Sequence, residues 1–243
     1  MKKGTIQKAG KWLLNALLPR ACAHCGTDLH YLESAPLCPA CAARLEPLPE
    51  LVCAACGLPL PDGGATCRDC RGRGPGQLDL ARSAFVFNPE LRSLLHSFKY
   101  RAREDLAAWL GSEMARSFTR FPELADYSFA AAVPLHPARS RERGFNQAEL
   151  LAAALAERAN LFLLRGAARR RRNTPTQTAL SRDKRRVNMA GAFEVADPAL
   201  VQDRKILLID DVATTLSTLD ELAREFRKAG AKAVAAYTLA REP

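Results

Sequence analysis

KILLIDDV (205–212), TLDELAREFRKAG (218–230) and AVAAYTLA (233–240) lie near the C-terminus and decide the fold. The first and third segments are continuous apolar runs, which is typical of strands buried on both faces of a parallel sheet. The middle segment has apolar residues at helical spacing and ends at Gly230, a residue that suits the position just after a helix. The order strand, helix, strand predicts an α/β domain with a parallel sheet.

Upstream segments extend the same pattern. SAFVF (83–87) and FAAAV (129–133) predict two more strands, and helices are predicted from Asn88-Pro89-Glu90 onward and over 145–159. In such sheets, ligands bind just past the carboxyl ends of the strands. This rule directs attention to residues 210–218.

An acidic pair and a hydroxyl-rich loop follow the strand at 205–212. Asp210 and Asp211 end the strand, and the following loop carries the hydroxyl residues Thr214, Thr215, Ser217 and Thr218. Backbone N–H groups at a helix start, together with hydroxyls, suit a phosphate. Adjacent carboxylates can hold ribose hydroxyls or a hydrated Mg²⁺. The combination describes a ribose 5-phosphate, and the alternative is a strand end with solvated acids.

All eight cysteines form four Cys-x-x-Cys pairs, separated by 12, 11 and 10 residues. The pairs are Cys22/Cys25, Cys38/Cys41, Cys53/Cys56 and Cys67/Cys70. Two such pairs make a tetrahedral thiolate site for structural Zn²⁺, so the count predicts two sites. Gly26 and Gly57 follow a second cysteine, where the turn favours positive φ. Disulfides and an iron–sulfur cluster are the alternatives, and the spacing leaves sequential and interleaved pairing open.

The composition is that of a globular protein. With 243 residues, 48% of them apolar, the chain is neither collagen-like, nor wholly disordered, nor a polytopic membrane protein. A net charge of +10 favours polyanionic partners such as phosphates or nucleic acid. No apolar run approaches the roughly 18 residues of a transmembrane helix, and the apolar stretch at 12–18 is too short and interrupted for a secretory signal. We therefore expect a cytoplasmic protein.

Basic residues gather in two clusters. One holds Arg139, Arg141 and Arg143; the other spans residues 165–186 and includes the run Arg169, Arg170, Arg171 and Arg172. Guanidinium groups match the oxygens of pyrophosphate, and a run of arginines also suits a nucleic-acid backbone. A solvated loop is the simplest alternative for the run, and a solvated helix end is the alternative for Lys99.

The order of the motifs resembles one known family. The cysteine pairs are followed by FKYRAREDLA (98–107), VPLHPARSRERGFNQA (133–148) and NTPTQTALSRDKRRVNMAGAF (173–193), and then by the acidic loop. This order resembles the ComF family of competence-associated proteins, which includes GntX-like relatives. The resemblance covers essentially the whole chain. It implies a double zinc ribbon joined to a type I phosphoribosyltransferase domain.

The resemblance implies a division of the chain and a set of site residues. The divisions are an amphipathic segment (1–20), the double zinc ribbon (21–71), a linker (72–82) and the phosphoribosyltransferase-like domain (83–243). Asp210 and Asp211 are the implied catalytic residues. Phosphoribosyl pyrophosphate (PRPP) binding is expected at Ala213, Thr214, Thr215, Leu216, Ser217, Thr218, Lys99, Arg141 and Arg143, and contact with pyrophosphate or nucleic acid at Arg169, Arg170, Arg171 and Arg172. A glycine usually occupies the position of Leu216, so we expect a crowded or rotated loop.

The implied activity is displacement at C1 of PRPP with Mg²⁺, in a protein of DNA uptake or utilisation. Two alternatives accompany it. One is a non-catalytic accessory factor that binds single-stranded DNA, with a competence helicase and a recombination mediator as partners. The other is a PRPP-sensing regulator with the same pocket and no turnover.

Overall fold

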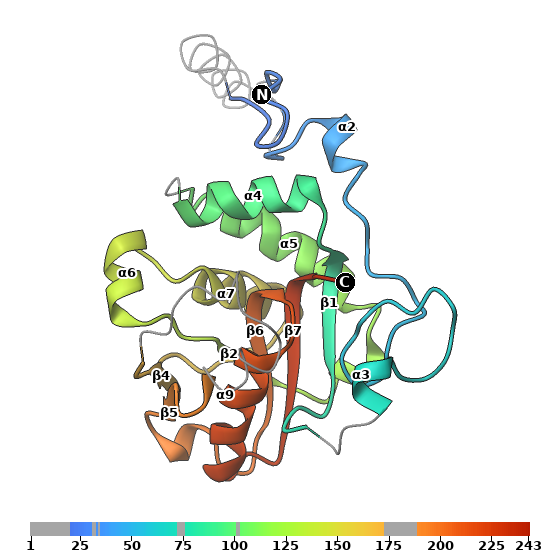
Figure 1. Cartoon of the computed structure of the whole chain (residues 1–243). Coiled ribbons are helices and arrows are strands. Elements are labelled where there is room, and N and C mark those ends of the chain that lie inside the picture. The colour runs from blue at the N-terminus through green and yellow to red at the C-terminus, as the bar shows by residue number, and fades with distance from the viewer. Residues whose placement is uncertain (1–19, 31–32, 34, 72–75, 101–102, 173–188) are drawn as a thin grey trace, which may run out of the picture.

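A five-stranded parallel sheet forms the centre of the computed structural model, which describes residues 20–30, 33, 35–71, 76–100, 103–172 and 189–243 (Figure 1). The strands are β1 (Ala81–Val86), β2 (Phe129–Ala132), β3 (Phe162–Leu163), β6 (Lys205–Ala213) and β7 (Ala233–Arg241). Their order in the sheet is β1-β7-β6-β2-β3, and every neighbouring pair is parallel. The predicted α/β fold is confirmed, and β1 begins two residues earlier than the sequence suggested.

Helices cover both faces of the sheet. On one face lie α4 (Pro89–Tyr100), α5 (Leu106–Phe118) and α7 (Gln147–Ala159), and on the other lies α9 (Ser217–Lys228). Alternate residues of a strand point to opposite faces. Accordingly Leu207 and Ile209 join the first apolar cluster, while Ile206 and Leu208 join the second, which contains Phe226 of α9. Strand β6 is thus buried on both sides, as its continuous apolar sequence predicts.

Smaller elements surround the sheet. An antiparallel hairpin of β4 (Ala168–Arg170) and β5 (Phe193–Val195) and the short helix α6 (Pro137–Arg143) were not predicted. The remaining elements are α2 (Pro39–Ala42), α3 (Arg68–Arg71) and the 3-10 turns η1 (Pro122–Leu124) and η3 (Pro198–Leu200). Among the described residues, no helix is both long and apolar enough to cross a membrane.

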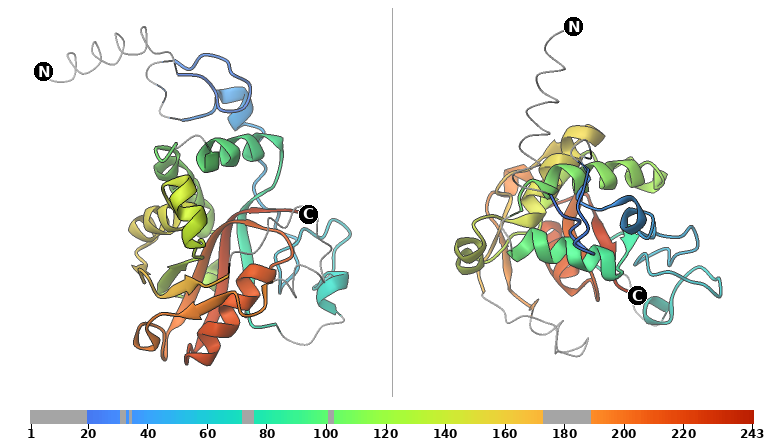
Figure 2. Two further views of the ribbon diagram at one scale, coloured as in Figure 1. Left: turned by 60° about the vertical axis from the view of Figure 1, so that its left-hand side comes forward. Right: turned by 90° about the horizontal axis from the view of Figure 1, so that it is seen from above.

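The N-terminal cysteine region forms two lobes that lie apart on the α/β domain. The lobe with α2 sits above α4, and the lobe with α3 sits beside β1 (Figures 1 and 2). Between them the chain runs along the β1 edge, where Leu48 N donates a hydrogen bond to Ala84 O at 3.0 Å. This distance is typical of backbone hydrogen bonds. Three predicted segments lie wholly or partly outside the described residues. They are most of the amphipathic segment (1–20), residues 72–75 of the linker and residues 173–188 of the basic stretch.

Candidate functional site

The acidic pair stands at the carboxyl end of β6, in the middle of the sheet. The carboxylate of Asp211 forms an ion pair with the ammonium of Lys99, which lies in the last turn of α4. Both side chains are largely shielded, at 13% and 23% exposure. Lys99 is therefore not a solvated helix end, and it brings a positive charge from a segment about 110 positions away to the acidic pair.

Burial changes the proton affinity of this cluster. Burial and the neighbouring charge of Asp211 raise the pKa of Asp210 to about 7, against opposing effects of the Asp211 amide, Lys99 and Arg170. The Asp211 amide donates to Asp210 Oδ1 at 2.8 Å. Burial lowers the pKa of Lys99, but the ion pair with Asp211 outweighs it and the net direction is upward. Asp211 thus lies beside a fixed cation, and the raised pKa lets Asp210 take up a proton near neutral pH.

The hydroxyl loop connects β6 to the N-terminus of α9. Thr215 Oγ1 and Ser217 Oγ lie 2.6 Å apart, and the loop lines a hollow of about 20 Å³ together with Asp210. Leu216 adopts φ 61°, the left-handed conformation that glycine adopts without strain. Its side chain packs against the apolar core under α9 and against the sulfurs of the second cysteine cluster. The leucine therefore reaches the backbone shape of the glycine at a cost of roughly 1–3 kcal/mol.

Helix α6 divides the first arginine cluster. Residues two apart on a helix point to nearly opposite sides, so Arg141 faces away from Arg139 and Arg143. Arg141 is exposed, whereas the other two are half-buried. Arg143 donates to Gln147 Oε1 at 3.0 Å, stacks 5.0 Å over the Tyr100 ring and acts electrostatically on Lys99. Arg143 thus lies near Lys99, and the structure does not bring Arg141 there.

Strand β4 ends at Arg170, so Arg171 and Arg172 of the second cluster lie beyond the strand. Arg170 is half-buried over the Phe193 ring, and burial and the charge of Arg139 lower its pKa while Asp210 opposes this effect. Arg169, Arg171 and Arg172 are exposed. Only Arg170 of the run therefore faces the acidic pair. Arg139, which was grouped with the basic cluster but not chosen as a site residue, is its neighbour.

A larger cavity of about 210 Å³ lies beyond the end of β2, between β3 and the start of β4. Its lining includes Pro134, Glu149 and Arg165, and none of the hydroxyl-loop residues. We place the candidate site at the smaller hollow, because Asp210 lines it together with the hydroxyl loop. His136, at the start of α6, accepts from Ala138 N at 3.2 Å through Nδ1 and so caps that helix.

The cysteines form two separate groups of four. Cys22, Cys25, Cys38 and Cys41 make the first, Cys53, Cys56, Cys67 and Cys70 make the second, and the sulfurs of each group lie within 4.8 Å of one another. The pairing that the spacing left open is therefore sequential. Gly26 and Gly57 have φ of 76° and 66°, as the turn after each second cysteine requires. Four convergent thiols fit a closed tetrahedral zinc site. We name the first group zinc site 1 and the second group zinc site 2.

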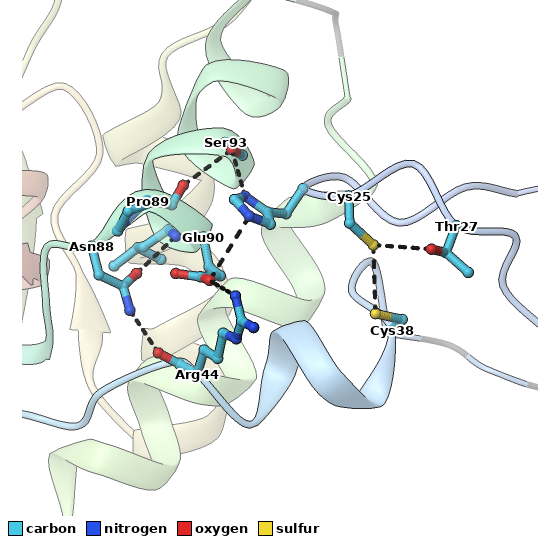
Figure 3. A network of polar contacts seen from close by, with 10 residues as sticks. Cys25, Thr27, Cys38, Arg44, Asn88, Pro89, Glu90 and Ser93 are labelled. Atoms are coloured by element: carbon cyan, nitrogen blue, oxygen red, sulfur yellow. Dashed lines mark hydrogen bonds and ion pairs between the residues drawn. The ribbon is translucent and has the colours of Figure 1, made fainter.

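Zinc site 1 is attached to the N-terminal end of α4 by side chains. His24 Nδ1 lies 3.0 Å from Ser93 Oγ, and the buried Glu90 carboxylate lies 3.4 Å from Arg44 Nη1. Asn88 Nδ2 donates to Arg44 O at 2.6 Å (Figure 3). This network holds the first lobe on the helix whose other end carries Lys99.

Two domain families match parts of this chain. Residues 13–71 match the double zinc ribbon domain family, and residues 141–243 match the phosphoribosyl transferase domain family. Competence protein F of Haemophilus influenzae is 30% identical over 228 residues, which covers 90% of this chain and 96% of the relative. DNA utilization protein YhgH of Escherichia coli K12 is 33% identical over 211 residues, which covers 84% and 90%.

Among solved structures, the glutamine PRPP amidotransferase of Bacillus subtilis, in complex with ADP and GMP, aligns with a TM-score of 0.39 and 15% identity. The alignment covers 59% of this chain and 30% of that chain.

Proposed function

The chain belongs to the competence protein F family, and on this premise we propose that it binds PRPP with Mg²⁺ at the carboxyl end of β6 and serves DNA uptake or utilisation. One observation carries the proposal. Lys99, Arg170 and the pair Asp210 and Asp211 come from three distant segments and act on one another electrostatically, and Asp210 lines a hollow with the hydroxyl loop that precedes α9. Such a cluster of opposite charges next to a helix N-terminus suits a ligand that has both a diol and phosphates.

In the proposed complex, the carboxylates of Asp210 and Asp211 accept hydrogen bonds from the ribose hydroxyls. Residues 213–218 receive the 5-phosphate at the start of α9. Arg170 and Arg143 neutralise the pyrophosphate, and Lys99 turns from Asp211 to a phosphate oxygen when the hydroxyls take its place. Arg141 lies on the far side of α6, so we propose that it contacts the ligand only after the ligand has bound.

Mg²⁺, when bound with PRPP, would be held by ligand oxygens and through water by Asp210 and Asp211, and would withdraw charge from the pyrophosphate. In the transfer reaction, a bond from the acceptor to C1 forms while the bond from C1 to the pyrophosphate oxygen breaks. The negative charge that develops on the departing pyrophosphate is stabilised by Arg143 and Arg170. Release of pyrophosphate distinguishes a transferase from a PRPP-sensing regulator, because the regulator binds PRPP without cleaving it.

Isothermal titration with PRPP and Mg²⁺ tests the proposal. Asp211→Asn should weaken binding by tenfold or more, because a charged acceptor contributes roughly 1.5–3 kcal/mol. Asp126→Asn is the matched control, since Asp126 also pairs with a lysine, Lys205, at 2.7 Å, but at the opposite end of the sheet. That variant should bind within twofold of the wild type. Absence of binding heat for the wild-type protein would reject PRPP as the ligand.

Single-stranded DNA is a second ligand class that a specific observation favours. Arg169, Arg171 and Arg172 are exposed on the β4 hairpin, away from Arg170. Exposed arginines bind nucleic-acid phosphates in a strongly salt-dependent way. Replacing these three by alanine should reduce the slope of the logarithm of the DNA-binding constant against the logarithm of the salt concentration. The expected reduction corresponds to the loss of about two to three phosphate contacts. Arg170→Ala should leave the slope unchanged while weakening PRPP binding, and equal effects on both ligands would contradict the division.

The proposed setting is the cytoplasm. Eight cysteines arranged as metal sites suit a reducing compartment, where thiols persist. The partners we propose there are a competence helicase and a recombination mediator that act on the incoming strand. Co-purification of either with the intact protein, lost on replacement of the exposed arginines, tests this assignment.

A further inference from the structure

Arg241, the last residue of β7, makes an unusual set of hydrogen bonds. Its side chain is buried, at 2% exposure, although it ends an otherwise apolar strand. Nη1 donates to Ala213 O at 3.0 Å and also to Thr214 O, and Nε donates to Cys56 O at 3.1 Å. The guanidinium therefore lies between the start of the hydroxyl loop and zinc site 2. A buried guanidinium satisfied by backbone carbonyls is costly to replace.

The two loop carbonyls reveal what this contact does to the backbone. Successive carbonyls of an extended strand point to opposite sides, yet those of Ala213 and Thr214 both point to Arg241. In a planar trans peptide, the N–H points opposite to the C=O. The amides of Thr214 and Thr215 therefore both point away from Arg241. Successive amides on one side form the concave arrangement that binds anions.

The other side of Arg241 is held by zinc site 2. The Cys53–Cys56 turn is fixed against the sheet, because a Cβ on Gly57 would lie 2.5 Å from Ala81 O and Ala81 N donates to Ala55 O at 2.8 Å. Leu216 packs against the buried sulfurs of the same site. The hydroxyl loop thus contacts zinc site 2 at both of its ends, through Arg241 and through Leu216.

We propose that Arg241 is a positioning residue that shapes the hydroxyl loop for a sugar phosphate by tying its carbonyls to zinc site 2. This inference rests on the proposed function for its ligand. It assigns to zinc site 2 a role in ligand binding that zinc site 1 does not have, because the contacts of His24, Arg44 and Glu90 join zinc site 1 to the start of α4 and not to the loop.

Arg82 offers a matched control. It is also a buried arginine that grips the same turn, because Nη1 donates to Ala54 O at 3.0 Å, but its other partners are Ala81 O and Glu123 and not the loop. We expect Arg241→Lys to raise the dissociation constant of PRPP with Mg²⁺ about tenfold, because a single ammonium cannot replace the fork, and Arg82→Lys to stay within twofold. Both variants should retain two zinc ions per chain. An unchanged constant for Arg241→Lys, or equal weakening by both variants, would overturn the proposal.

Amide hydrogen exchange of residues 213–217 without any ligand provides an independent measurement. We expect Arg241→Lys to accelerate exchange in this segment at least fivefold and Arg82→Lys to leave it unchanged. If Arg241→Lys does not fold, Leu216→Ala replaces it, because this change removes the second contact with zinc site 2. Equal exchange in variant and wild type would reject the positioning role. If the wild-type protein binds no PRPP while the exchange result is as expected, the proposed ligand is wrong but the link between loop and zinc site 2 stands.

Discussion

The two zinc sites have the same ligands but different neighbours. Zinc site 1 leaves Cys25 exposed and reaches the α/β domain through His24 and Arg44, which contact the start of α4. Zinc site 2 buries Cys53 completely and contacts the hydroxyl loop through Arg241. The comparison teaches that four thiols define a metal but not its role, which depends on the surface against which the site is packed.

Distance separates the two routes to the candidate pocket. From Pro89 to Lys99, α4 places about 15 Å of helix between zinc site 1 and the acidic pair. The helix keeps its own backbone hydrogen bonds, so it should hold Lys99 when the far contact is lost. The loop at 213–217 is not helical before α9 begins, and it is held by Arg241, by the packing of Leu216 and by the contact between Thr215 and Ser217. We therefore expect ligand binding to depend more on zinc site 2.

Loss of one zinc ion at a time gives the largest expected contrast. Cys56→Ser and Cys25→Ser should each lower the zinc content from two ions per chain to one, given one ion per four thiolates. Cys56→Ser should also weaken PRPP binding more than tenfold, whereas Cys25→Ser should weaken it less than threefold, in line with the direct loop contact. Metal analysis and titration calorimetry measure both quantities. The comparison fails if the two substitutions weaken PRPP binding to the same extent.

A change at the pocket end of α4 should have the next largest effect. Lys99→Gln removes the ammonium that turns to a phosphate oxygen in the proposed complex and should weaken PRPP binding about tenfold, since a hydrogen bond to a charged group contributes roughly 1.5–3 kcal/mol. Gln keeps an unbranched, polar side chain that is one atom shorter, so a loss of helix packing is not expected. Lys205→Gln, in the exposed pair with Asp126, is the control and should bind as the wild type does.

The same variant should alter the pH dependence of stability. In the folded protein the pKa of Asp210 is raised to about 7, whereas the ordinary pKa of an aspartate is 3.8. The unfolded chain therefore loses this proton first, and the contribution of Asp210 to stability falls as the pH rises from about 4 to about 7. Lys99 counteracts the upward shift, so in Lys99→Gln the fall should continue to higher pH. Melting temperatures measured between pH 4 and 9 check the direction, and a curve parallel to that of the wild type would contradict it.

Leu216→Gly should have a smaller effect. The substitution removes the strain of a leucine at φ 61° but also removes its packing against zinc site 2, and each term is roughly 1–3 kcal/mol. We expect the melting temperature to change by only a few degrees and PRPP binding to change less than threefold. A gain in affinity of tenfold or more would show instead that the leucine obstructs the phosphate.

The smallest effect is expected at the outer end of α4. Arg44→Gln loosens the contact between the first lobe and Glu90, and such a half-exposed ion pair contributes about 1 kcal/mol or less. The melting temperature should fall by a few degrees while PRPP binding stays within twofold. If this variant weakened PRPP binding as strongly as Arg241→Lys, zinc site 1 would be coupled to the pocket as closely as zinc site 2.

The secondary structure near the C-terminus, the cysteine turns and the place of the acidic pair could be predicted from sequence, because each depends on residues that are close together in the chain. The apolar period of β6 and β7, the helical period of α9 and the Cys-x-x-Cys turns each depend on residues within one turn or one strand. The same holds for Asp210 and Asp211, since a strand that ends in two acids must present them at the edge of the sheet. The secondary structure around the acidic pair therefore agrees with the predicted segments to within a few residues.

The tertiary structure decided which distant groups meet. Lys99 and Asp211 are brought together because α4 ends above the carboxyl edge of the sheet, and the cysteine pairs join sequentially because the two lobes pack on different elements. Arg170, the last residue of β4, is half-buried over Phe193 and the other three arginines of the run are exposed, a difference that four identical side chains in a row cannot encode. Arg241 lies one residue beyond the strand predicted at 233–240, and the sequence pattern did not single it out. Its role depends on the two chain segments that fold against it, because a hydrogen bond needs both partners in place.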